Sequence, residues 1–247
     1  MSGIRDIAHA ALLRPSPLER YYARPIRRVE RDGVVFVTGD EDDLVVVTGP
    51  VTPQRLFALA GAVFDGGAYG VVVDVDCAPL VDEALRAAGW VLDEEEPALV
   101  LMPIPASPPP LPELDIRRVA TQQGLDDFFA VTRTPRRHIP SLAAALDPDV
   151  ALFVGYVDGA PVATSRVSCL GEVGDLMGVV TEDAYRRRGI GTAMTWAAIE
   201  AARQRGCATI TLSATEMGRP IYQRMGFVYA CTLRTYLPPS AAETTEE

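Results

Sequence analysis

One short segment constrains this chain more than any other. It begins at Val179 and reads Val-Val-Thr-Glu-Asp-Ala-Tyr-Arg-Arg-Arg-Gly-Ile-Gly-Thr. The β-branched residues at its start predict a strand, and Gly189 and Gly191 allow the backbone to bend and to approach a ligand closely. A helix that begins directly after such a turn points its unpaired N–H groups and the positive end of its dipole toward the turn. The segment therefore predicts a site for a phosphate group.

A second motif follows, separated from the first by one predicted helix and one predicted strand. Residues 221–227 read Ile-Tyr-Gln-Arg-Met-Gly-Phe, which places Tyr222 on a short helix that ends at Gly226, a residue suited to a left-handed helix cap. The spacing Arg-x-x-Gly-x-Gly of the first motif is weak by itself, because arginine and glycine are common in ordinary turns. The second motif, found in this order, makes the prediction more specific.

Together, residues 179–227 resemble the acetyl-CoA-binding core of the GNAT (GCN5-related) N-acetyltransferase superfamily. The family's Arg/Gln-x-x-Gly-x-Gly/Ala turn matches the residues from Arg186 onward, and its Tyr-x-x-x-Gly-Phe element matches those from Tyr222 onward. The proline that often precedes the turn in this family is Asp183 here. This departure lies in the loop before the turn, so we expect the phosphate contacts to be undisturbed.

The composition limits the classes of protein to consider. With 247 residues, 48% of them hydrophobic, the chain can bury one large core or two modest ones, and its length slightly favours two domains. No apolar run reaches the ~20 residues that cross a bilayer, and the N-terminus lacks the apolar centre of a signal peptide, so we expect a cytoplasmic protein that does not bind membranes. Its 23 basic and 33 acidic residues give a net charge of −10, which argues against nucleic-acid binding and favours cationic partners.

Four cysteines are scattered along the chain, without the close pairs that zinc sites or redox motifs require. They are Cys77, Cys169, Cys207 and Cys231. We expect buried free thiols and no metal.

A proline-rich connector divides the sequence, because it can continue neither a helix nor a central strand. We predict a first domain at 1–103, the connector at 104–112, a second domain at 113–238 and a disordered tail at 239–247. Before the connector, strands are expected at 34–38, 44–48, 69–75 and 98–102, and helices at 53–64 and 78–88. After it, strands are expected at 114–119, 151–157, 160–169, 175–181, 207–213 and 227–237, and helices at 122–133, 192–205 and 219–225.

The order of these elements after the connector is the GNAT order. The resemblance therefore implies an α/β fold with a mixed, mostly antiparallel sheet flanked by helices. The first half, particularly 69–102, is similar to the degenerate first domain of tandem GNAT proteins. It contains neither motif, so we expect it to form a partial GNAT-like domain without catalytic residues, which packs on the second domain and borders the acceptor cleft.

The resemblance also implies how acetyl-CoA binds. Backbone N–H groups of the glycine turn would face the pyrophosphate, with arginine side chains adding charge at its edge. One backbone N–H of the strand that precedes the turn would polarise the acetyl carbonyl; the side chains of Val179 and Val180 themselves are expected in the core. The predicted coenzyme-binding residues are Val179, Val180, Thr181, Arg186, Arg187, Arg188, Gly189, Ile190, Gly191 and Thr192.

Tyr222 is the predicted catalytic acid, whose hydroxyl would protonate the departing thiolate. The alternative interpretation is a tyrosine that only packs on a helix face. Two candidates are open for the catalytic base: Asp175, at the head of the strand that leads into the turn, and Glu216, at the end of the next strand where GNAT sheets splay apart. His138 lies in a loop that borders the expected substrate cleft, but a lone histidine there is more often incidental.

We therefore predict an acetyl-CoA-dependent N-acetyltransferase of the GNAT type, an acyltransferase that acetylates a primary amine of a small molecule by direct transfer in a ternary complex. The alternatives are a non-catalytic acyl-CoA-binding regulatory module and a protein or peptide N-acetyltransferase. The chain is expected to be a monomer or a homodimer. A fold does not name a substrate; the loop at 133–141 and the first domain would shape the acceptor pocket, and the acidic surface favours polyamine-like, amino-sugar or amino-acid-derived amines.

Overall fold

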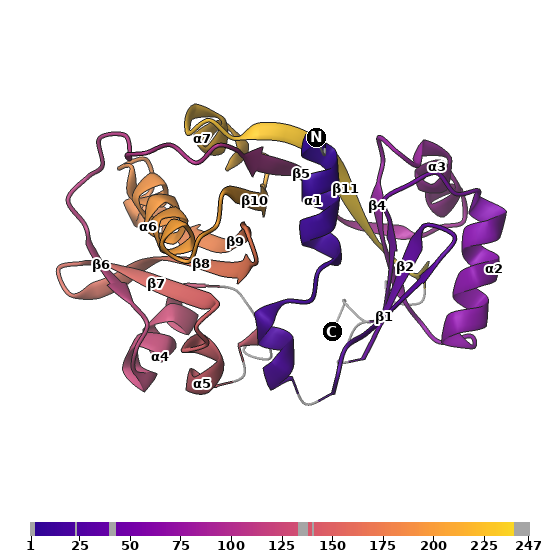
Figure 1. The fold of residues 1–247 in the computed structure, drawn as a ribbon, viewed down its shortest axis with the longest axis horizontal. Coiled ribbons are helices and arrows are strands. Elements are labelled where there is room, and N and C mark those ends of the chain that lie inside the picture. Colours follow the sequence, from indigo (N-terminus) through magenta and orange to yellow (C-terminus); the bar gives the residue numbers. More distant parts are fainter. Residues whose placement is uncertain (1–2, 23, 40–42, 133–137, 140, 240–247) are drawn as a thin grey trace.

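The computed structural model describes residues 3–22, 24–39, 43–132, 138–139 and 141–239. The predicted disordered tail, apart from residue 239, and most of the loop at 133–141 lie outside these residues. The described strands join into one eleven-stranded sheet (Figure 1). Its order is β1 (Arg27–Arg31), β2 (Val34–Thr38), β3 (Leu44–Val47), β4 (Gly70–Asp74), β11 (Val228–Leu237), β5 (Val91–Leu101), β10 (Thr209–Ser213), β9 (Val173–Thr181), β8 (Ala160–Leu170), β7 (Val150–Val157) and β6 (Asp115–Arg118).

Helices flank this sheet in two lobes. In the first lobe, α2 and α3 contribute Leu56, Leu59 and Leu85 to a core shared with strands β2, β3 and β4. In the second lobe, α6 packs on β8 and β9. The helices are α1 (Ile4–Leu13), α2 (Pro53–Phe64), α3 (Pro79–Ala87), α4 (Gln122–Val131), α5 (Leu142–Ala145), α6 (Ile190–Gln204) and α7 (Arg219–Arg224), with short 3₁₀ helices η1 (Pro17–Tyr21) and η3 (Asp183–Tyr185).

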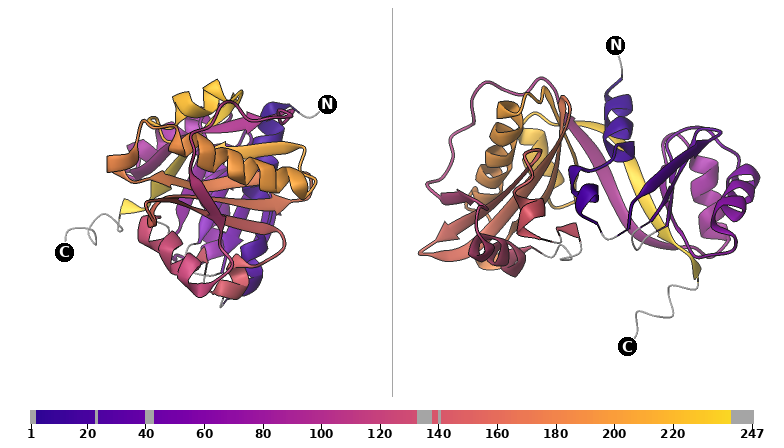
Figure 2. Two further views of the ribbon diagram at one scale, coloured as in Figure 1. Left: turned by 90° about the vertical axis from the view of Figure 1, so that its left-hand side faces the viewer. Right: turned by 60° about the horizontal axis from the view of Figure 1, so that its bottom comes forward.

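The two halves of the chain exchange strands. The last strand, β11, lies between β4 and β5 of the first half, while β5 lies between β11 and β10 of the second half. Figure 1 shows β5 and β11 running from one lobe to the other, and Figure 2 shows α1 between the lobes. The connector at 104–112 therefore separates two halves of the sequence that share one sheet, and the predicted domain boundaries stay a prediction.

The sheet is mixed and mostly antiparallel, as predicted. Only the pairs β3–β4 and β9–β10 are parallel among the described strands. Local sequence signals explain several of its turns. Asp158 and Gly159 both have positive φ, of 51° and 80°, in the two-residue hairpin turn between β7 and β8. Gly226 has a φ of 94° where α7 ends, which is the predicted left-handed cap.

Several elements differ from the sequence prediction. The helices α1 and α5, the 3₁₀ helices and the strand β1 were not predicted, and β5 begins at Val91 rather than at residue 98. The acidic start of β5 has low intrinsic strand propensity. It is extended because it pairs with β11 along its length, where Arg234 forms an ion pair with Glu95. Tertiary pairing here overrides the local preference of the sequence.

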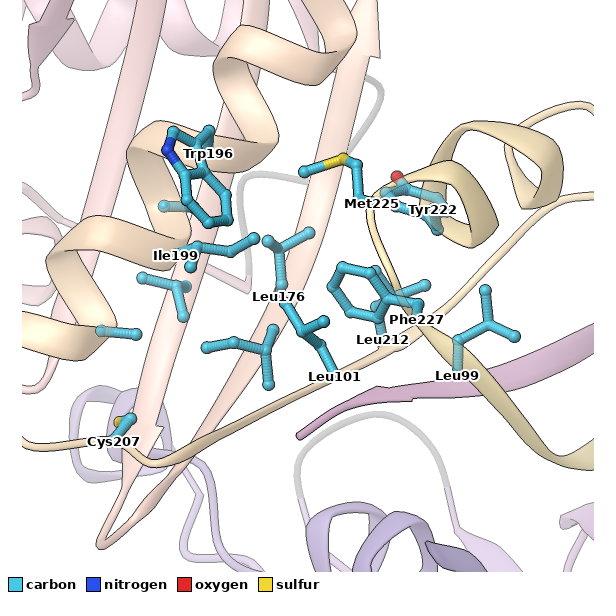
Figure 3. Close-up of a cluster of buried hydrophobic side chains, with 14 of the residues drawn as sticks. Leu99, Leu101, Leu176, Trp196, Ile199, Cys207, Leu212, Tyr222, Met225 and Phe227 are labelled. Carbon is cyan, nitrogen blue, oxygen red and sulfur yellow. The ribbon is translucent and has the colours of Figure 1, made fainter. Parts of the chain in front are cut away.

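The core of the second lobe includes residues from both halves. Leu99 and Leu101 of β5 pack with Leu176, Ile199, Leu212 and Phe227, as Figure 3 shows. Cys169, Cys207 and Cys231 are buried, Cys77 is half-buried, and all four are free thiols. Within the described residues, no helix has the length and apolar character needed to span a bilayer.

Candidate active site

An open strand edge lies in the middle of the second lobe. Strand β9 pairs with β10 only at its beginning, where Val173 to Asp175 lie beside Thr209 to Thr211. From Leu176 to Thr181, no described strand pairs with this edge, although β8 continues to pair with the other edge of β9. The backbone donors and acceptors of the open edge are therefore available to a ligand.

A β-bulge interrupts β9 along this open edge. Between two consecutive cross-strand pairs, β8 contributes one residue, Ser165, whereas β9 contributes two, Gly178 and Val179. Gly178 has a φ of 62°, and its carbonyl accepts a hydrogen bond of 3.0 Å from the Thr164 hydroxyl. A bulge takes a backbone group out of the ladder and redirects it. Sequence reasoning missed Gly178, although a single glycine inside a strand pattern is the usual signal of a bulge.

The glycine turn after β9 presents an array of free backbone donors. Arg187 and Gly189 have positive φ values of 63° and 77°, and α6 begins at Ile190. The first bond of the helix runs from the Ala193 N–H to the Gly189 carbonyl. In the described part of the chain, no intramolecular hydrogen bond is donated by the backbone N–H groups of residues 187–192. This geometry is typical of an anion site at a helix N-terminus.

The arginines of the turn are exposed, and two of them also hold its shape. The Arg186 Nε donates to the Thr181 carbonyl at 3.1 Å, and its Nη2 lies 2.7 Å from Asp183. The Arg188 Nη2 donates to a carbonyl within the same turn at 3.1 Å, and its guanidinium lies over the Tyr185 ring. These contacts fix the path between the end of β9 and the start of α6.

Tyr222 lies on α7 with its ring in the core. The ring contacts Phe227 at a centroid distance of 5.6 Å, and Figure 3 shows Met225 beside it. Burial raises the pKa of Tyr222 to about 12; a hydrogen bond with Thr195 of α6 lowers it and the negative charge of Glu96 raises it further. The phenol is therefore protonated throughout the physiological pH range. The interpretation of Tyr222 as a packed residue is correct for its ring, while its hydroxyl remains the candidate acid.

A cavity of about 940 Å³ opens beside the bulge. Its walls come from β5, β8, β9 and β10 of the sheet and from α1 and η1. Gly178 and Val180 line it, so the cavity reaches the open edge of β9. The expectation that both valine side chains are core is wrong for Val180, whereas Val179 packs against the core. Consecutive strand residues point to opposite faces of the sheet, and the bulge, which shifts this alternation, determines that Val179 faces the core and Val180 the cavity.

The two candidate bases lie in different environments. Asp175 lines the cavity, and burial raises its pKa to about 6 against the opposing effects of Arg166 and Thr211. Glu216 is exposed in the turn before α7 and is not among the residues that line the cavity. His138, the third titratable residue considered, is half-buried and does not line the cavity either.

A further carboxylate reaches the cavity from the first half of the chain. Glu96 of β5 lines it, and burial together with the neighbouring Glu94 raises the pKa of Glu96, opposed by a hydrogen bond from Ser213. Sequence reasoning missed Glu96. Its only signal was an acidic run that ends at residue 96, and nothing in that run indicated that β5 crosses into the second lobe.

One group of side chains could offer ligands to a metal ion. Ligand atoms of His9, Asp74 and Cys77 lie within 4.8 Å of one another, at the contact between α1 and the end of β4. The Arg5 guanidinium occupies the same place, with its Nε 3.5 Å from Asp74 and its Nη1 3.5 Å from the Cys77 sulfur. Because this cation already neutralises Asp74, the group serves to hold α1 against the sheet.

Comparison with known proteins identifies the second half of the chain. The model of the acetyltransferase (GNAT) family matches residues 118–227, which include the open edge, the bulge, the glycine turn and Tyr222. These residues are a GNAT acetyltransferase domain. The family and the enzyme class predicted from the sequence are thereby confirmed. No curated protein matches the sequence.

Solved structures of GNAT proteins share the fold of the whole chain. A GCN5-related N-acetyltransferase from Kribbella flavida has a TM-score of 0.72 at 23% identity, with 97% of both chains covered. A tandem GNAT protein from the clavulanic acid biosynthesis pathway has a TM-score of 0.59 at 14% identity, with 94% of this chain and 91% of that chain covered. A GCN5-related N-acetyltransferase from Sphaerobacter thermophilus has a TM-score of 0.55 at 16% identity, with 87% of this chain and 76% of that chain covered. The first half of this chain thus belongs to the shared fold.

Proposed function

We propose that this protein is an acetyl-CoA-dependent N-acetyltransferase that acetylates a primary amine of a small molecule by direct transfer in a ternary complex. One observation carries the proposal. The open edge of β9 borders the cavity at Asp175, Gly178 and Val180, on both sides of the bulge, and the same strand leads directly into the glycine turn. A coenzyme held at the turn and an amine held in the cavity would therefore reach the same backbone segment, which supplies proximity.

The coenzyme would bind through backbone groups. Its pyrophosphate would accept hydrogen bonds from the free N–H groups at the start of α6, and its pantetheine arm would pair with the open edge of β9. A backbone N–H between Val179 and Thr181 would polarise the thioester carbonyl, as donors of an oxyanion hole do. The side chains of Arg186, Arg187 and Arg188 would add positive charge at the edge of the pyrophosphate site.

The transfer step needs one base and one donor to sulfur. The ammonium loses one proton to the base, and the resulting amine nitrogen forms a bond to the carbonyl carbon. The carbon–sulfur bond then breaks, the nitrogen loses its second proton and the thiolate gains one, so that overall one proton is left on the base and one on sulfur. Asp175 fits the base because it lines the cavity and has a pKa of about 6, close to neutral pH. Tyr222, with a pKa of about 12, would stabilise the developing thiolate mainly through a hydrogen bond, because an ordinary thiol with a pKa of about 8.5 is the stronger acid.

The size of the cavity favours a small acceptor over a peptide. Its volume of about 940 Å³ lies within the range of roughly 300–1,000 Å³ that is typical of sites for small molecules. A peptide acetyltransferase would need an extended groove. The remaining alternative, a module that binds acyl-CoA without turning it over, predicts binding of acetyl-CoA without release of free thiol in the presence of any amine.

The test is a screen of diverse amines for free-thiol release from acetyl-CoA, with Tyr222→Phe as the variant. We expect Tyr222→Phe to bind acetyl-CoA as the wild type does and to lose turnover by roughly 10²-fold or more, because the ring stays and only the donor is removed. Tyr229→Phe is the matched control, since the Tyr229 hydroxyl bonds to Asp76 on the surface. Equal turnover of Tyr222→Phe and Tyr229→Phe, with chemistry rate-limiting, would remove Tyr222 from the mechanism.

A further inference from the structure

The wall of the cavity contains a buried arginine that lacks an oxygen partner. Arg166 of β8 is only 7% exposed, and its Nε and Nη1 have no hydrogen-bond partner. Its Nη2 contacts only the thioether sulfur of Met177, at 3.4 Å. A buried guanidinium is costly unless it is paired with an acceptor, and most of the donors of this one are unused.

A second unused polar group lies on the same face of β8. Ser168 is two residues beyond Arg166, so both side chains point to the same side of the sheet, and both line the cavity. The Ser168 hydroxyl oxygen is buried and also has no partner. The two groups form a donor patch, Arg166 and Ser168, that faces the cavity.

Carboxylates line the same cavity beside the donor patch. Asp175 of β9 lies directly opposite Ser168 and diagonal to Arg166, and diagonal positions are separated by roughly 7–8 Å. Among the described residues, no acidic side chain is bonded to the Nε or Nη1 of Arg166. Burial lowers the pKa of Arg166, and the charge of Asp175 opposes this effect through space. Glu94 and Glu96 add two more carboxylates from β5. The cavity thus presents a cationic donor patch with carboxylates beside it.

The other arginines of the lining are already engaged. Arg28 is bound by Glu19 through both of its terminal nitrogens, which leaves its buried Nε without a partner, and Arg14 is exposed and donates to the Leu170 carbonyl at 2.8 Å. Among the described lining residues, Arg166 is therefore the cation that has neither a carboxylate nor a carbonyl bonded to its guanidinium. Its position opposite Met177, the residue before Gly178, places it next to the bulge at which the acetyl group would be held.

We infer that the acceptor amine carries a carboxylate, which binds Arg166 and Ser168 while its amino group faces Asp175 and Glu96. This inference rests on the proposed function. One guanidinium matches the single charge of a carboxylate through charge-assisted hydrogen bonds. A dianionic phosphate would bring excess negative charge beside Asp175, Glu94 and Glu96, and an amine without an acidic group would leave the donor patch unpaired.

The experiment compares matched acceptors on the full chain. Free-thiol release from acetyl-CoA is measured with pools of L-amino acids, with the corresponding decarboxylated amines and with phosphoethanolamine, and binding of each pool is measured by calorimetry in the presence of CoA. We expect kcat/KM to be about 10- to 100-fold higher for the carboxylated member of a pair, the effect of hydrogen bonds to a charged group. In Arg166→Gln we expect this preference to disappear while the affinity for acetyl-CoA stays unchanged.

Arg14→Gln is the matched control, because it removes the same charge from the same lining at a residue already bonded to Leu170, and it should keep the preference. Arg166→Gln should also fold, since it removes a buried charge that forms no ion pair within the described residues. Because Arg166 also lowers the pKa of Asp175, the variant is judged by its preference between paired acceptors, which a change in the base affects equally. The inference fails if decarboxylated amines are used as well as amino acids, if phosphoethanolamine is preferred, or if no amino acid binds while acetyl-CoA does. Failure of acetyl-CoA to bind would instead overturn the proposed function.

Discussion

The coenzyme site can be tested at Gly191, where the free protein has room for a side chain. A Cβ added to Gly191 would meet only the Thr181 hydroxyl, at 3.7 Å, which is an ordinary van der Waals distance. Gly191 also has helical backbone at the start of α6. Alanine therefore fits the free protein, and it should stabilise α6 by up to ~1 kcal/mol, because glycine loses more backbone entropy on folding. For a chain of this size that gain corresponds to a rise in melting temperature of roughly 2–4 °C.

The same substitution should weaken the binding of the coenzyme. A methyl group at Gly191 would stand between the pyrophosphate and the first N–H groups of α6, and losing a hydrogen bond to a charged group costs roughly 1.5–3 kcal/mol. We therefore expect the Kd for acetyl-CoA to rise about 10- to 100-fold in Gly191→Ala, while its melting temperature is equal to that of the wild type or higher. Calorimetry and thermal unfolding measure the two effects separately.

Gly61→Ala is the control for this prediction. Gly61 lies on the exposed side of α2 with nothing within 4 Å of an added Cβ, so alanine should stabilise the helix without any effect on coenzyme affinity. Gly189 would be a poor choice, because its φ of 77° and the contact at 3.3 Å with Pro112 make any side chain strain the turn itself. Unchanged affinity in Gly191→Ala would refute the assignment of the turn to the pyrophosphate.

Two further predictions concern the base and the shared sheet. Asp175 is ionised above its pKa of about 6, so kcat/KM should rise with pH through that value. This rise should disappear in Asp175→Asn and remain in Glu96→Gln. If instead the rise remains in Asp175→Asn and disappears in Glu96→Gln, the base is Glu96. A chain that begins at Leu111 lacks β5 and exposes the edges of β10 and β11, so we expect it to aggregate. If size-exclusion chromatography and circular dichroism show a monomeric, folded fragment, the first half is not needed to cover these strand edges.

The part of the site that sequence reasoning predicted is the part that is contiguous in sequence. The glycine turn needs only a strand end, two glycines and a helix start within a few residues, and each has a local physical signature. The cap at Gly226 and the hairpin turn at Asp158 follow from the same local rules. The bulge at Gly178 had a local signal too, but a glycine in a strand does not by itself reveal which edge of the strand is open.

The acceptor cavity could not be predicted in this way, because the exchange of strands creates it. Glu96 reaches the site only because β5 is inserted between β10 and β11, a pairing between residues more than a hundred positions apart. The helix α1, from the N-terminus, forms another wall. Arg166 reads in the sequence as one polar residue in a strand, and its significance comes from burial without a partner, which is a property of the folded chain. The proposed determinants of coenzyme binding are therefore local, and the inferred determinants of acceptor choice depend on how the two halves are joined.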